Sequence, residues 1–211
     1  MSNKPRNIKN EYELRNKIDH LDKIANAYLI EIGDFYWEDL FFMSIIDKSI
    51  KLIDSFLFAL EKRNVTVLAV LTRVQMDCVM RAFATTMVSD SDEFCRAVLI
   101  DNMQVNKIKD MNNQNLTDRH ICEALGKYID YPVYDLYQKV CRFIHFSSDS
   151  FYSIAKVENN PQLTMYISRN NRAENKEEFE RISLELANQF LFFGSILIEN
   201  IFVSWLKQKN L

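Results

Sequence analysis

The stretch Asn64–Val88, NVTVLAVLTRVQMDCVMRAFATTMV, places the strongest constraint on what this chain can fold into. At 100° per residue its apolar side chains cover almost the whole circumference, which is typical of a helix in the middle of a core. Arg73, Asp77 and Arg81 follow one another at intervals of four residues, so they share one narrow stripe of that helix. Unpaired charges in a core are costly, and the alternating signs allow pairing along the helix. The stretch therefore predicts a central helix with a polar site. We expect Asp77→Ala to cost roughly 3–5 kcal/mol of stability, because it leaves buried arginine charge unpaired.

The composition indicates a mainly α protein. The chain of 211 residues contains only three Gly and three Pro, whereas β-sandwiches and dinucleotide-binding folds need many more turn and phosphate-cradling glycines. We expect a bundle of six or seven helices in one domain over residues 1–211. The net charge is −3, and Lys and Arg are spread along the chain. The sequence therefore lacks the clustered basic residues that are typical of a protein that binds duplex nucleic acid.

Hydrophobic periodicity and capping residues predict where these helices lie. The expected ranges are 10–32, 35–63, 64–88, 90–107, a short helix capped by Thr117, 132–146 and 175–207. Two β-branched and aromatic runs around the turn-rich sequence ENNPQ predict one small β-hairpin at about residues 151–168.

The apolar run Ala187–Trp205 resembles a membrane span, but polar residues interrupt it. A central acidic residue such as Glu199 costs about 2.5–3.5 kcal/mol in a bilayer, so we expect a buried amphipathic helix and no membrane partner. The polar N-terminus has no apolar signal-peptide segment, and the four cysteines are scattered without a CxxC pair. These features favour a cytoplasmic protein with free thiols.

Two groups of side chains invite comparison with metal sites. Cys141 and His145 are four residues apart on one predicted helix, but His120 and Cys122 diverge by about 160° on another, which is poor geometry for shared zinc ligation. Acidic residues also recur along the second predicted helix without the Glu-x-x-His signature of di-iron bundles, and they are expected to face solvent. They are Asp39, Asp47, Asp54 and Glu61. We expect no metal, and because GxGxxG, Walker A, GxSxG and HExxH motifs are missing from the sequence, no cofactor.

His145 is the most informative titratable residue. It lies at the border of the apolar stripe of the sixth predicted helix, beside Tyr134, where a half-buried histidine can transfer protons. Arg142, Ser147 and Ser148 lie close to it in the sequence and extend the group of candidate binding residues. The structural alternative is a partly buried histidine that bonds a backbone carbonyl or caps the helix.

The Arg73-x-x-x-Asp77 step, followed later by a helix-ending His145 beside serines, resembles uncharacterised all-helical bacterial families near the HEPN superfamily, the higher-eukaryote and prokaryote nucleotide-binding domain. The resemblance covers Val65–Ser150. It implies RNA or nucleotide as the ligand, metal-independent RNA cleavage, a homodimer that completes the site, and a phage-defence or toxin–antitoxin setting. In that family an Arg stands several residues before the His, whereas here only two residues separate Arg142 from His145.

Two functions follow from these observations. In the first, Arg73, Asp77, Arg81 and His145 form one pocket: His145 transfers the proton, an Arg stabilises phosphate charge and Asp77 orients that Arg. In the second, the chain is a non-catalytic interaction or regulatory module, and the Arg-Asp-Arg stripe is a structural ion ladder. An open pocket that contains both Arg73 and His145 would favour the first function, and a sealed ladder the second.

Overall fold

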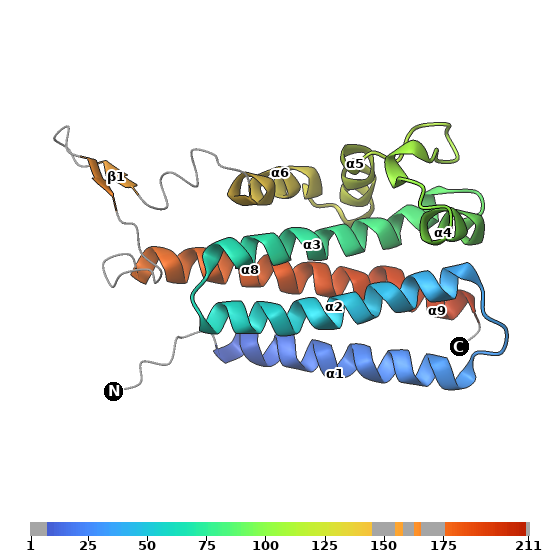
Figure 1. Ribbon diagram of the computed structural model, residues 1–211, viewed down its shortest axis with the longest axis horizontal. Helices are drawn as coiled ribbons and strands as arrows, with labels where there is room; N and C mark the ends of the chain where they lie inside the picture. Colours follow the sequence, from blue (N-terminus) through green and yellow to red (C-terminus); the bar gives the residue numbers. More distant parts are fainter. Residues whose placement is uncertain (1–7, 145–154, 158–162, 166–175, 210–211) are drawn as a thin grey trace.

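The computed structural model describes residues 8–144, 155–157, 163–165 and 176–209 (Figure 1). Seven helices make up most of this part of the chain, which confirms the mainly α prediction. They are α1 (Ile8–Glu31), α2 (Trp37–Glu61), α3 (Val65–Ala84), α4 (Ser91–Leu99), α5 (Asp118–Ile129), α6 (Val133–Ile144) and a last continuous helix made of α8 (Lys176–Ser195), the π-helical segment η4 (Ile196–Phe202) and α9 (Val203–Gln208). Short 3-10 turns, η1 (Thr85–Met87) and η2 (Val105–Lys107), follow α3 and α4.

The helices form a long bundle with a second, shorter layer. Figure 1 shows α1, α2, α3 and α8 running along the length of the molecule, with α5 and α6 lying over α3. Helix α3 contacts α2, α8, α5 and α6, and α1 contacts α2 and α8. The position of α3 agrees with the expectation of a central helix. Its first turns are nevertheless open, because Val67 and Val70 are exposed.

Local sequence signals set most helix boundaries. The Asn64 side chain accepts a hydrogen bond from the Val67 N–H at 3.1 Å and caps α3, and Thr117 caps α5 in the same way. The fourth helix is shorter than the predicted range 90–107. It ends at Leu99, because the chain then turns through Asn102, whose φ of 53° is in the left-handed region.

Between α6 and α8 the structure describes two three-residue strands, β1 (Ala155–Val157) and β2 (Leu163–Met165). They pair antiparallel, with Ala155 opposite Met165. Most of the hairpin predicted over residues 151–168 lies outside the described residues, so the full hairpin stays a prediction. The core itself is helical.

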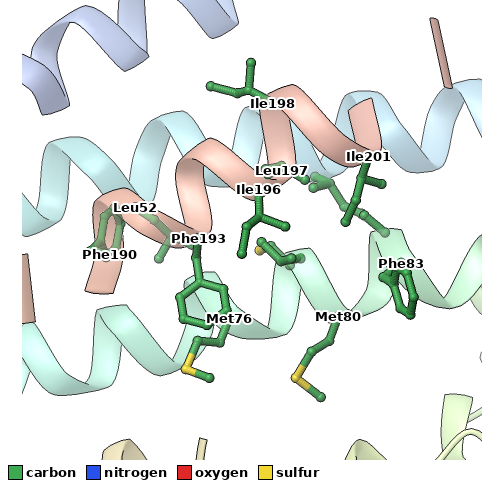
Figure 2. Close-up of a cluster of buried hydrophobic side chains, with 14 of the residues drawn as sticks. Leu52, Met76, Met80, Phe83, Phe190, Phe193, Ile196, Leu197, Ile198 and Ile201 are labelled. Atoms are coloured by element: carbon green, nitrogen blue, oxygen red, sulfur yellow. The ribbon is translucent and has the colours of Figure 1, made fainter. Parts of the chain in front are cut away.

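The centre of the core lies where the last helix packs on α2 and α3 (Figure 2). Each large apolar side chain that is fully buried there contributes roughly 1.5–3 kcal/mol. Figure 2 shows Leu52 of α2, Met76, Met80 and Phe83 of α3, and Phe190, Phe193, Ile196, Leu197, Ile198 and Ile201 of the last helix.

The last helix is the one described helix that is long and apolar enough to cross a membrane. Its apolar window has a mean hydropathy of 1.5, and 59% of that window is buried inside the protein. The core helix of a soluble bundle has the same length and composition, so this feature is weak evidence for a membrane span. Packing against α2 and α3 accounts for its apolar character.

Candidate functional site

Arg73, Asp77 and Arg81 form the ion ladder that their spacing predicts. Arg73 Nη1 lies 3.4 Å from Asp77 Oδ1, and Arg81 Nη2 lies 3.2 Å from the same oxygen. All three residues lie on the edge of α3 that faces α5 and α6. The ladder therefore lies at the junction between the long bundle and the shorter layer of helices.

Asp118 completes this junction from α5. Its Oδ1 accepts a hydrogen bond from Arg81 Nη2 at 2.8 Å, and its Oδ2 lies 3.4 Å from Arg73 Nη2. Asp118 is the first residue of α5, where the helix dipole favours a negative charge. Two guanidinium groups thus share two carboxylates that come from different helices.

Tyr137 of α6 links the same groups. Its hydroxyl donates to Asp118 Oδ2 at 2.8 Å and accepts from Arg73 Nη2 at 2.7 Å, while the Arg73 guanidinium lies 4.1 Å from the centre of the Tyr137 ring. The ring is also nearly parallel to that of Tyr134, at 14° and a centroid separation of 6.3 Å. The Arg119 guanidinium also lies 5.4 Å from the centre of the Tyr134 ring. The result is a continuous stack of cations and aromatic rings from α3 to α5.

The electrostatic environment shifts the pKa values of Arg73 and Asp118 toward their charged forms. Burial lowers the pKa of Arg73, but the Asp77 carboxylate and the thiol of Cys141 outweigh burial, so the pKa is raised overall. Burial raises the pKa of Asp118, but the hydrogen bond from Tyr137 and the charge of Arg81 outweigh it and hold that pKa below its usual value. The junction pairs two arginines with two aspartates, so its formal charges cancel.

The hydroxyl of Tyr137 stays protonated. Burial raises its pKa first, and the hydrogen bond to the Asp118 carboxylate raises it further. A neutral hydroxyl is a donor, so it adds a third donor to the two guanidinium groups around Asp118.

The junction is partly open to solvent. The exposed fractions of the side chains are 17% for Arg73, 25% for Arg81 and 34% for both Asp77 and Asp118. Arg81 Nη1, in contrast, is buried and has no hydrogen-bond partner among the described residues. The arginine pairs are thus neither sealed in the core nor fully hydrated.

The structure brings some of the predicted site residues together and leaves others apart. Tyr134 joins the junction through its stacking on Tyr137, whereas Arg142 is exposed on α6, turned about 140° from Tyr137 around the helix. His145, Ser147 and Ser148 lie outside the described residues. A pocket shared by Arg73 and His145 therefore stays a prediction.

Reasoning from the sequence missed Asp118 and Tyr137. The acidic residue directly after the cap Thr117 signals a charge suited to a helix N-terminus, but not which side chains it faces. Tyr137 belongs to the apolar stripe of α6, and this pattern predicts that its ring is buried. The pattern does not indicate which group its hydroxyl bonds to. Both contacts depend on how α5 and α6 cross α3.

His120 and Cys122 face different partners, as their spacing predicts. The His120 ring donates a hydrogen bond from Nε2 to Asp110 Oδ2 at 2.9 Å, and the buried Cys122 thiol lies 3.5 Å from Met80 Sδ. Within the described ranges, no cluster of three His, Cys, Asp or Glu side chains could hold a metal ion.

Asp39 is not on a solvated face of α2, which corrects the expectation from the sequence. Its side chain is 1% exposed, accepts hydrogen bonds from the Tyr28 hydroxyl at 2.5 Å and the Tyr36 N–H at 2.7 Å, and lies 3.2 Å from Lys209 Nζ. A residue at the end of the last helix thus neutralises a charge at the start of α2. Long-range pairing of this kind leaves no periodic signal in the sequence.

Comparisons with protein-family models, with curated proteins and with solved structures found no match to this chain.

Proposed function

We propose that this chain is a HEPN-like protein that acts on or binds RNA or nucleotides, with the α3–α5–α6 junction as its phosphate-binding site. One observation carries the proposal: three donor groups, from Arg73, Arg81 and Tyr137, converge on the carboxylate of Asp118. A carboxylate and a phosphate present similar pairs of anionic oxygens to arginine. The donors are thus already positioned for an anion.

The partial exposure of the junction supports access by a ligand. A phosphate group that approaches Arg73 and Arg81 from solvent would compete with Asp118 for their guanidinium groups. In this proposal Asp77 keeps its contacts with both guanidinium groups. Binding would then require only small movements of the side chains.

Cleavage would depend on His145 as the proton-transfer group, with Ser147, Ser148 and Arg142 contacting RNA and a second copy of the chain completing the site. The proposal includes a cytoplasmic protein without a metal or cofactor, in a phage-defence or toxin–antitoxin setting. General acid–base catalysis by a positioned histidine contributes about 10²- to 10⁴-fold to a rate. The reaction requires no redox chemistry.

The test compares RNA degradation and growth arrest by the wild type with those by His145→Ala. We expect the variant to fold, since a histidine at the border of an apolar stripe adds little packing, and to lose both activities. Equal activity of the two proteins would remove His145 from the catalytic site.

A binding measurement tests the junction separately. Fluorescence anisotropy with a short single-stranded RNA should show weaker binding by Arg81→Met than by the matched control Arg96→Met, whose arginine lies on α4 and pairs with Glu93 and with Asp101 just after that helix. Losing one phosphate contact should also reduce the dependence of affinity on salt. Equal affinities and salt slopes in the two variants would contradict phosphate binding at the junction.

The second candidate function, a non-catalytic interaction or regulatory module, is favoured by the cancellation of charge at the junction. Arg73 and Arg81 are each paired with both Asp77 and Asp118, so the ladder needs no external anion. In that case Arg81→Met would lower stability and leave RNA binding unchanged.

A further inference from the structure

A shallow depression of about 400 Å³ lies where α5 turns into α6. Its shape is set by the backbone: the Tyr131 N–H donates to the Gly126 carbonyl at 3.0 Å, and Asp130 adopts a left-handed conformation with φ 51°. A Cβ atom at position 126 would lie 2.7 Å from the Tyr131 carbonyl oxygen, so glycine is required for this close approach. The depression is thus a preformed feature of the turn.

Two aromatic rings line the depression. Tyr131 is 40% exposed and packs against Phe192 of α8 at a centroid distance of 4.8 Å, which restrains its orientation. The Tyr134 ring is restrained by its contacts with Tyr137 and Arg119, which belong to the stack described above. Partly exposed rings with restrained orientations are suitable surfaces for stacking a flat ligand.

The polar groups around these rings are mainly hydrogen-bond acceptors. Asp130 and Asp135 line the depression and form no ion pair within the described part of the chain, whereas Glu123 is engaged by Arg119 at 2.7 Å. Lys127 also lines the depression and is exposed. An ionised carboxylate only accepts hydrogen bonds, so the lining favours a ligand edge with two adjacent N–H donors.

Among the nucleobases, guanine has such an edge. Its N1–H and its exocyclic N2 amino group lie side by side and can donate to the two oxygens of one carboxylate, while the purine stacks on an aromatic ring. Adenine and cytosine place a ring-nitrogen acceptor next to their amino group, and that acceptor would face a carboxylate oxygen. The acidic lining therefore discriminates between bases as well as binding them.

We propose that the α5–α6 depression binds a guanine base, with the stacked Tyr134 as its platform and Asp130 or Asp135 as its hydrogen-bond acceptor. Tyr134 stacks on Tyr137, whose hydroxyl contacts Arg73 and Asp118, so the depression adjoins the proposed phosphate site. Only the placement of the phosphate rests on the proposed function. The base site has its own geometry and its own test.

Isothermal titration calorimetry on the full chain tests the base site with guanosine and adenosine, neither of which carries a phosphate. We expect guanosine to bind at least about tenfold more tightly than adenosine, because the mismatched edge leaves polar groups unpaired. Tyr134→Ala should weaken guanosine binding by about tenfold through loss of stacking. The conservative variants Asp130→Asn and Asp135→Asn identify the acceptor, since one of them should abolish the preference for guanosine.

The control is Tyr12→Ala, which removes a tyrosine that is 66% exposed on α1, away from the depression. This variant should bind guanosine as the wild type does, and circular dichroism should show that all variants are folded. Equal affinity for guanosine and adenosine, no binding of either, or an unchanged affinity in Tyr134→Ala would overturn the proposal.

Guanosine monophosphate separates this proposal from the function proposed above. If guanosine binds selectively and the monophosphate binds no more tightly, the base site stands and the phosphate site fails. If guanosine and adenosine monophosphates bind equally well and the nucleosides do not bind, the base site fails while the phosphate site stands.

Discussion

Replacing Asp118 by alanine should destabilise the protein more than replacing Asp77. The change removes the 2.8 Å contacts of Asp118 with Arg81 and Tyr137 and leaves two guanidinium groups to share one carboxylate. Breaking a fully buried pair costs roughly 3–5 kcal/mol, and breaking an exposed pair about 0.2–1 kcal/mol. Because the side chains at the junction are between 17% and 34% exposed, solvent screening places the expected loss at about 2–3 kcal/mol.

Asp77→Ala should cost less, about 1–2 kcal/mol. The ladder alone predicts a larger loss of stability, roughly 3–5 kcal/mol. If Asp77 were the partner of both arginines and Asp118 were not there, removing Asp77 would leave both arginine charges unpaired. In the structure Asp118 remains and still pairs with both of them. The measurement is urea unfolding followed by circular dichroism. In thermal unfolding, each kcal/mol of lost stability should lower Tm by about 2–4 °C for a chain of this size.

The pH dependence gives an independent check. The folded-state pKa of Asp118 is lowered, so its contribution to stability is fully present above its unfolded pKa of about 3.9 and is lost as the pH falls through the folded value. The stability difference between the wild type and Asp118→Asn should therefore be constant near neutral pH and shrink below about pH 4. A larger loss in Asp77→Ala than in Asp118→Ala, or a difference that does not change with acid, would refute this reasoning.

Three further predictions follow from other parts of the structure. Lys209→Met should lower the free energy of unfolding by about 2 kcal/mol because it leaves the buried Asp39 carboxylate without a cation, while the control Lys51→Met on the surface should be nearly neutral in the same urea titration. Gly126→Ala should destabilise by about 1–3 kcal/mol in thermal unfolding, since the new methyl group meets a backbone oxygen at 2.7 Å; an unchanged Tm would contradict the tight turn. A thiol reagent at pH 8 should label the partly exposed Cys141 in the native protein and the three buried cysteines only after unfolding; rapid labelling of all four would count against the core.

Helix positions could be predicted well because their signals are local. Caps such as Asn64 and Thr117 bond to backbone groups three residues away, and apolar periodicity shows which face is buried. The Arg73–Asp77–Arg81 pairing is equally local, because residues four apart always meet on a helix. The fourth helix was predicted too long because apolar residues continue past Leu99, whereas the left-handed turn at Asn102 ends the helix.

Contacts between distant segments could not be predicted. Asp118 and Asp39 are ordinary helix-start carboxylates in the sequence, yet Asp118 bridges two arginines of a different helix and Asp39 is buried against the end of the last helix. A carboxylate near a helix N-terminus is favourable whether it is hydrated or paired, so its residue type does not indicate its partner. The identity of the partner depends on helix crossings.

The sequence by itself determined a mainly α class, the central position of α3 and the ion ladder on its edge, because each follows from side chains three or four residues apart. Only the tertiary structure decided that α5 and α6 meet this edge, that Asp118 and Tyr137 complete a neutral junction there, and that a depression with aromatic walls lies beside it. The physical reason is that packing between helices depends on summed burial over many side chains. A single charged or aromatic residue therefore does not reveal in the sequence which residue it will meet.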